Sequence, residues 1–163
     1  MSVDNTVLGS IVKRLLFTMI KNIEFFGSLD KKPYKFQHYD ISDFLLFVNG
    51  KQFPNNYLSW ACIMKRLQSF NYRTLFEASG IHHSNMGKQI THDMYIKGNF
   101  MLLFDFTHDR GEWESHTRHP KNGNMRMELK FNKPVTESIT CLLYIKFDNS
   151  YPIDFARTVT KVF

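Results

Sequence analysis

The sequence has 163 residues, of which 43% are hydrophobic and 15% aromatic, enough for one packed domain and too aromatic for a disordered chain. Its formal net charge is +6, but the lysines and arginines are spread along the chain, which excludes a polybasic tail. Cys62 and Cys141 are the only cysteines, which excludes a disulfide framework and favours a reducing compartment.

The N-terminal region is compatible with two structures. Residues 7–23 fit an amphipathic helix, whereas the segment LLFTMI alone is typical of a strand, and periodicity leaves both open. Lys13 and Arg14 interrupt the apolar run, so we expect neither a membrane-spanning helix nor a signal peptide, and a soluble protein. Pro33 and the alternation over residues 34–38 predict a loop followed by an extended segment.

The middle of the chain carries a hairpin signal and a helix signal. In DFLLFVNGKQFP, residues 43–54, Asn49-Gly50 suits the positive φ values of a tight turn between two strands. Residues 57–78 contain neither Pro nor Gly and place apolar side chains at helical spacing, which predicts one helical excursion. Residues 81–98 are polar and predict an exposed loop.

The C-terminal part predicts further strands. NFMLLFDF is a continuous apolar strand, the polar residues 107–124 form a long connection, and residues 125–131 alternate as in a half-buried strand. A last strong strand over 138–147 runs into FDNSYPIDFAR, where Pro152 prevents its immediate continuation. With six to eight strands and no βαβ rhythm, we expect one mainly β domain over 1–163, an antiparallel β-sandwich.

The sequence gives little support for a catalytic or metal-binding site. The histidines have no zinc-ligand spacing and the carboxylates near residues 105–114 are expected at a strand end and in a wet loop, so we expect no metal, no cofactor and no enzyme. A β-sandwich hydrolase ranks last among the functions. The candidates considered are His82, His83, His92, His116, His119, Asp105, Asp109, Glu112 and Glu114.

Nucleic-acid binding is an alternative. The segment KKPYKFQHY interleaves basic and aromatic residues, which can stack on bases while neutralising phosphates. The same residues also fit a strand with an aromatic inner face and a lysine outer face. The sequence leaves both interpretations open.

Several segments in order resemble a known family. They are GSLDKKPYKFQHYDISDFLLFVNGKQFP, SFNYRTLFEASG, NFMLLFDFTHD and GNMRMELKFNKPVTESITCLLYIKFDNSYPIDFARTV, with motifs at 33–39, 48–52, 104–109 and 147–157. This ordered set is similar to the C-terminal part of the hexon-like major capsid proteins of Polinton (Maverick) virus-like transposons and adintoviruses.

The resemblance implies a fold and a role. It implies that the chain is a single jelly-roll β-sandwich, equivalent to the second of the two jelly rolls in such capsid proteins. It implies structural work through protein–protein contacts, with self-association into trimers and no cofactor. The expected assembly contacts are Asp154, Arg157, Tyr151, Trp113 and Trp60.

Two origins fit the resemblance. The chain is expected to be a fragment of a capsid protein, located in a virion with other capsid proteins, or a module derived from a transposon and retained by a host inside the cell. A host-retained module that binds nucleic acid or another acidic ligand is the alternative function, and no membrane association is expected.

Overall fold

The computed structural model describes residues 2–10, 12–27, 29, 32–53, 64–81, 87, 89–107 and 122–147, and the statements below concern these residues. They form seven strands and three helices. The strands are β1 (Ser2–Ser10), β2 (Arg14–Lys21), β3 (Ile41–Val48), β4 (Lys51–Phe53), β5 (Leu102–Asp105), β6 (Asn122–Phe131) and β7 (Ile139–Lys146). The helices are α1 (Asn22–Phe25), α2 (Met64–Ser79) and α3 (His92–Gly98).

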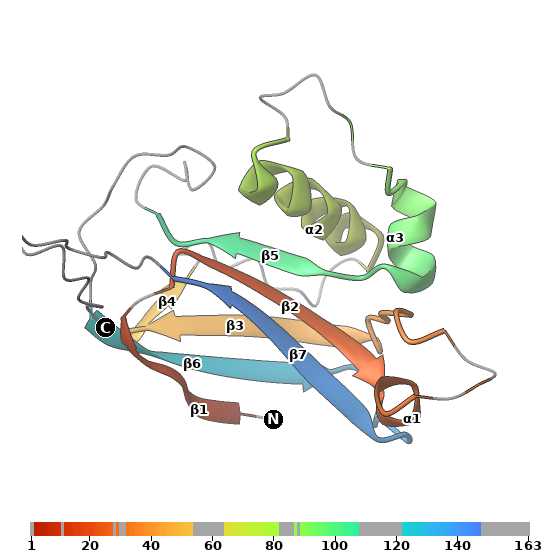
Figure 1. The fold of residues 1–163 in the computed structure, drawn as a ribbon, viewed down its shortest axis with the longest axis horizontal. Helices are drawn as coiled ribbons and strands as arrows, with labels where there is room; N and C mark the ends of the chain where they lie inside the picture. Colours follow the sequence, from red (N-terminus) through yellow and green to blue (C-terminus); the bar gives the residue numbers. More distant parts are fainter. Residues whose placement is uncertain are drawn as a thin grey trace, which may run out of the picture.

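The strands form two antiparallel sheets (Figure 1). One sheet has the order β1-β6-β3-β4 and the other the order β5-β2-β7. Every strand pairing is antiparallel, which confirms the prediction of a mainly β, antiparallel protein. Only β3 and β4 are consecutive neighbours in one sheet, because each other connection between described strands passes from one sheet to the other.

The predicted hairpin is present. β3 and β4 pair with Val48 opposite Lys51, and the turn between them has positive φ at Asn49 (51°) and Gly50 (74°). Two successive positive φ values give the turn the twist that an antiparallel hairpin needs. The Asn49 side-chain oxygen also accepts a hydrogen bond from the backbone N–H of Asn124 at 3.0 Å, which ties the turn to β6.

The alternation along β6 is confirmed by burial. Met125, Met127 and Leu129 are buried, whereas Arg126 and Lys130, at alternate positions, are exposed. β6 lies between β1 and β3, so its apolar side chains form the middle of the inner face of this sheet.

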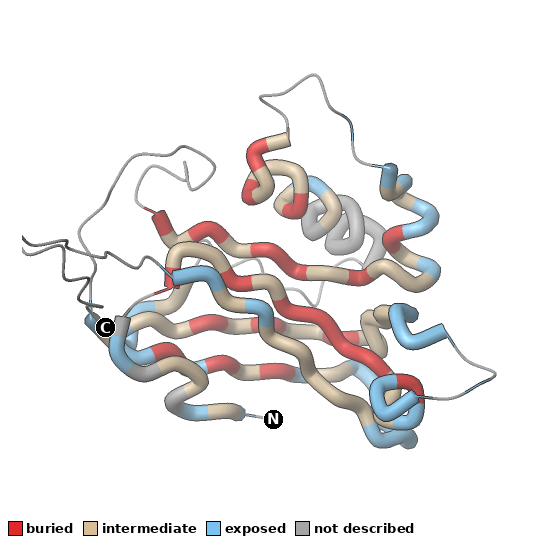
Figure 2. Tube along the Cα trace, viewed as in Figure 1, coloured by how far each residue is buried: buried red, intermediate tan, exposed pale blue. Residues whose placement is uncertain are grey.

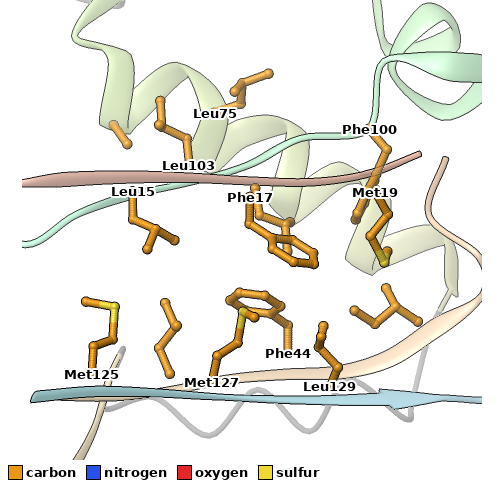
Figure 3. Close-up of a cluster of buried hydrophobic side chains, with 14 of the residues drawn as sticks. Leu15, Phe17, Met19, Phe44, Leu75, Phe100, Leu103, Met125, Met127 and Leu129 are labelled. Carbon is orange, nitrogen blue, oxygen red and sulfur yellow. The ribbon is translucent and has the colours of Figure 1, made fainter. Parts of the chain in front are cut away.

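The core lies between the two sheets (Figures 2 and 3). Phe17 of β2 and Phe44 of β3 meet with ring centroids 4.7 Å apart, and Phe104 stacks on Phe44 at 5.3 Å. These rings therefore join one sheet to the other. Around them lie the buried side chains Leu15, Met19, Ile41, Leu46, Leu102, Met125, Met127 and Leu129.

A second apolar layer covers β5, an edge strand of the three-stranded sheet. Figure 1 shows α2 above β5, and Leu75 of α2 and Leu103 of β5 lie on the far side of β2 from the main core in Figure 3. Tyr95 of α3 is fully buried, and its hydroxyl donates to the carbonyl of Met101 at 2.8 Å. The two longer helices thus lie on the β5 side of this sheet, whereas Tyr144 on β7 is exposed.

Several sequence expectations are corrected. The N-terminal region forms β1 and β2, which settles the helix or strand question in favour of strands. The predicted loop over 81–98 contains α3, which starts behind Thr91, whose hydroxyl accepts from the N–H of Met94 at 3.3 Å. The helix predicted over 57–78 is present as α2, but α1 and α3 are further helices that the sequence did not predict. The segment 34–38 forms only an isolated bridge from Phe36 to Asn99.

Replacement of Phe44 tests the core. Phe44→Ala removes the ring that contacts both Phe17 and Phe104, and we expect it to lower the free energy of unfolding by about 3–5 kcal/mol in urea denaturation. Phe47→Ala on the outer face of the same strand is the matched control and should cost markedly less. Equal losses for the two variants would contradict this arrangement of the core.

Candidate protein-interaction site

The five residues expected to make assembly contacts lie outside the described residues. They are Asp154, Arg157, Tyr151, Trp113 and Trp60. The same holds for four of the candidate histidines, His82, His83, His116 and His119, and for Asp109, Glu112 and Glu114. The structure leaves these assignments as predictions.

Two of the chemical candidates are described, and both have structural contacts. The buried carboxylate of Asp105 accepts from the N–H of Thr107 at 2.9 Å and from its hydroxyl at 2.5 Å, as in a turn at a strand end. The ring of His92 meets the edge of Tyr72 with centroids 5.4 Å apart. Within the described ranges, no three His, Cys, Asp or Glu side chains gather in a way that holds a metal ion.

Exposed apolar side chains instead gather beside α1. Four of the exposed large hydrophobic residues of the described chain fall between residues 23 and 29: Ile23, Phe25, Phe26 and Leu29. Figures 1 and 2 place α1 at one end of the sandwich, where β2 ends, and show most of this corner exposed. We call these four residues the α1 patch. Exposed apolar side chains grouped in one place mark interaction surfaces, whereas single ones carry no such meaning.

In α1 the charged side chain is buried, whereas the apolar side chains are exposed. Glu24 is only 6% exposed, whereas Ile23 is 58% and Phe26 is 77% exposed. In an isolated globular domain the apolar side chains of such a turn are expected to face the core. This orientation leaves the α1 patch exposed to solvent.

α1 is held in place by β7. The backbone N–H of Asn22 donates to the carbonyl of Ser138 at 2.9 Å, and the hydroxyl of Thr140 donates to the Asn22 side-chain oxygen at 2.9 Å. The N–H of Phe26 donates to the carbonyl of Asn22 at 3.1 Å, and Gly27 with φ of 96° then ends the turn. The α1 patch therefore lies at a helix that hydrogen bonds hold against Ser138 and Thr140.

An open pocket of about 430 Å³ lies beside the patch. A short ion pair forms its polar wall, because the Lys21 ammonium lies 2.6 Å from a carboxylate oxygen of Glu137. This hydrogen-bonded pairing raises the pKa of Lys21. The pocket is lined by Lys21, Asn22, Ile23, Phe26, Gly27, Glu137 and Ser138. Its lining combines an aromatic ring, backbone and one neutralised ion pair.

Tyr39 lies close enough to this corner for its ionisation to respond to the acidic groups there. Burial, and then the carboxylates of Glu137 and Glu24, raise the pKa of Tyr39 to about 12. Its hydroxyl is buried and has no hydrogen-bond partner among the described residues. Tyr39 and Asp40 both have positive φ, 47° and 50°, so two residues with side chains adopt the left-handed region in succession.

Among the described residues, this corner combines exposed apolar side chains with an open pocket. Sequence reasoning missed the α1 patch, although its signal, the run IEFF before Gly27, is visible in the sequence. A short apolar run gives no indication of whether it faces the core or solvent.

Comparisons with known proteins identify no relative. The chain matches no protein-family model, and neither a curated protein nor a solved structure is significantly similar to it. In the described part of the chain, none of the helices combines the length and apolar character needed to cross a membrane.

Removal of the Tyr39 hydroxyl tests the environment of this corner. At neutral pH, Tyr39→Phe should leave the free energy of unfolding unchanged or raise it by up to about 1 kcal/mol, because a buried hydroxyl without a partner is removed. Tyr34→Phe, at an exposed position, is the control and should have no effect.

The same variant has a defined effect at alkaline pH. The folded protein keeps the Tyr39 proton up to about pH 12, whereas the unfolded chain releases it near pH ~10. The wild type should therefore lose stability as pH rises between these values, and Tyr39→Phe should lose less. Chemical denaturation at several pH values measures both slopes, and identical slopes would show that Tyr39 is not protected from ionisation.

Proposed function

We propose that this chain is a structural assembly module of jelly-roll fold, derived from a viral capsid protein, and that it acts through protein–protein contacts. The resemblance of its ordered motifs to Polinton and adintovirus capsid proteins motivates the proposal. The main support for the proposal is the strand order, that is, how successive strands are distributed between the two sheets.

The strand order supports a jelly roll. A jelly roll has eight strands, lettered B to I along the chain, in two sheets of order B-I-D-G and C-H-E-F. If β1 is taken as strand C, the order β1-β6-β3-β4 corresponds to C-H-E-F. The order β7-β2-β5 then corresponds to I-D-G.

The connections support the same interpretation. A jelly roll changes sheet at every connection except the one between E and F. In this chain the corresponding strands are β3 and β4, which form the only hairpin within one sheet among the described strands. A sequence of simple hairpins would instead have made neighbours of β1 and β2.

The α1 patch supports contact with other subunits. It follows β2 at one end of the sandwich, and the loops at the ends of a sandwich carry most binding functions. Self-association, with the trimer favoured by the capsid resemblance, would cover these side chains. Whether the module belongs to a virion or has been retained by a host does not change this prediction.

Nucleic-acid binding is the weaker proposal. Two cations have carboxylate partners: Arg126 of β6 lies 2.9 Å from Asp4 of β1, and Lys133, beyond the end of β6, lies 3.3 Å from Asp40. Cations paired in this way attract phosphate less than a stripe of unpaired ones.

Substitution of Phe26 tests the assembly function. Because Phe26 is the most exposed ring of the patch, its burial in an interface should contribute about 1.5–3 kcal/mol, so Phe26→Ser should weaken self-association by roughly 10-fold to 100-fold. Sedimentation velocity over a wide concentration range measures the shift. Met94→Ser, at an exposed position of α3, is the matched control and should not alter association. A wild-type protein that stays monomeric throughout would contradict the proposal.

A further inference from the structure

Four strands lie at the edges of the two sheets: β1 and β4 in one sheet, and β5 and β7 in the other. An unprotected edge strand pairs with other chains, so proteins normally shorten it, bend it, charge it or cover it. Three of these edges have such protection. β1 has a register shift between Val3 and Val7, β4 has three residues beginning with Lys51, and β5 has four residues beneath α2.

β7 has none of these protections along most of its length. From Ile139 to Ile145 it contains no charged residue, no Pro and no Gly, and all eight residues of β7 pair with β2 in one unbroken register. Tyr144 is 69% exposed, and the other residues between 139 and 145 are half-buried. This strand is the long, regular and apolar edge of the described sheets.

The backbone of β7 directs alternate residues away from β2. The N–H of Asn22 donates to the carbonyl of Ser138, and in an antiparallel ladder every second pair exchanges such bonds. Thr140, Leu142 and Tyr144 therefore face β2 with their N–H and C=O groups. The groups that face the free edge belong to Ile139, Cys141, Leu143 and Ile145, and no described residue pairs with them.

The position next to β7 lies over β1 of the other sheet. Phe17 of β2 packs on Phe44 of β3, which places β2 over β3 and its neighbour β7 over β6. The next position beyond β7 then lies over β1. Val3 and Val7 of β1 belong to the margin of the core but are only partly buried, as expected where no described strand covers them.

This geometry admits one strand. A second copy that paired its own β7 with this edge would bring its β6 beneath the new strand, into the place that β1 occupies. Only a strand without an underlying sheet avoids that collision. The occupant is therefore a single extended segment, at the place that strand B takes in a jelly roll, and not another complete sandwich edge.

The two ends of β7 have opposite charge. Glu137 precedes the strand, whereas Lys146 ends it opposite Arg14 of β2. Glu137 is already paired with Lys21 at 2.6 Å, so charge at this edge does not select the partner strand.

We propose that the free edge of β7 binds a single extended β-strand of a partner protein, antiparallel to β7, with alternate apolar side chains facing Val3 and Val7. The inference rests on the proposed assembly function in taking a protein as the ligand. The backbone supplies the binding energy of such strand addition, and the pockets for alternate side chains supply its specificity.

Amide hydrogen exchange followed by NMR tests the edge. In the free protein the amides of Ile139, Cys141, Leu143 and Ile145 should exchange faster than those of Thr140, Leu142 and Tyr144. The probe is a synthetic peptide of about nine residues, long enough to span β7, with alternating valine and threonine. Its addition should slow exchange of the four edge amides by at least about tenfold and leave the other three unchanged.

Matched variants sharpen the test. Cys141→Pro removes an N–H that faces the edge and not β2, so it should abolish peptide binding, whereas Cys141→Ala should retain it. The inference is overturned if the edge amides are already as protected as their neighbours in the free protein, or if the peptide leaves them unprotected at millimolar concentration.

This result is separable from the proposed function. Self-association that depends on Phe26 together with a protected β7 edge would retain the assembly module and reject strand binding. An open, peptide-binding edge in a protein that stays monomeric would retain strand binding and reject self-assembly.

Discussion

The contact between Phe17 and Phe44 is the interaction on which the rest of this structure depends. It brings a three-stranded and a four-stranded sheet face to face, and Phe104 extends the same contact to the outer strand β5. Because side chains alternate between the faces of a strand, the burial of Phe17 also decides which residues of β2 face outward. A slip of one residue would exchange the two faces, so the register of β7 and β5 on β2 depends on this packing.

The register of β7 on β2 decides which residues of β7 hold α1 and which direct their backbone groups to the free edge. Thr140 uses its hydroxyl to hold Asn22, and with it α1 and the α1 patch. The alternate residues of β7 direct their backbone groups to the open edge. The α1 patch and the β7 edge are therefore adjacent parts of one surface, joined by the pocket that contains Glu137 and Ser138. A partner that inserts a strand beside β7 would end close to the exposed ring of Phe26.

Much of the strand content follows from local sequence. The Asn49-Gly50 turn and the alternation from Met125 to Phe131 were predicted correctly because each is decided within a few residues by turn geometry or by a period of two. The N-terminal region was ambiguous because β1 and β2, strands of different sheets, follow each other closely, and their combined apolar residues imitate helical spacing. α3 was missed although Thr91 and Asp93 are suitable residues for a helix start.

The site was less accessible to sequence reasoning than the fold. The contact residues chosen from the resemblance lie outside the described residues, whereas the α1 patch owes its character to tertiary structure. Nothing local indicates that Glu24 turns inward while Phe26 turns outward, because that orientation depends on the attachment of Asn22 to β7. The free edge of β7 likewise depends on strand order, which no single segment specifies.

Strand order is the central claim, and proton contacts measured by NMR test it most directly. Since Phe17 and Leu143 form a pair without mutual hydrogen bonds, as do Leu16 and Leu103, their Hα protons should be close enough for strong nuclear Overhauser effects. The account predicts both contacts, with β2 in the middle of its sheet. Contacts that pair β2 with β1 or β3, as in a meander of successive hairpins, would contradict it.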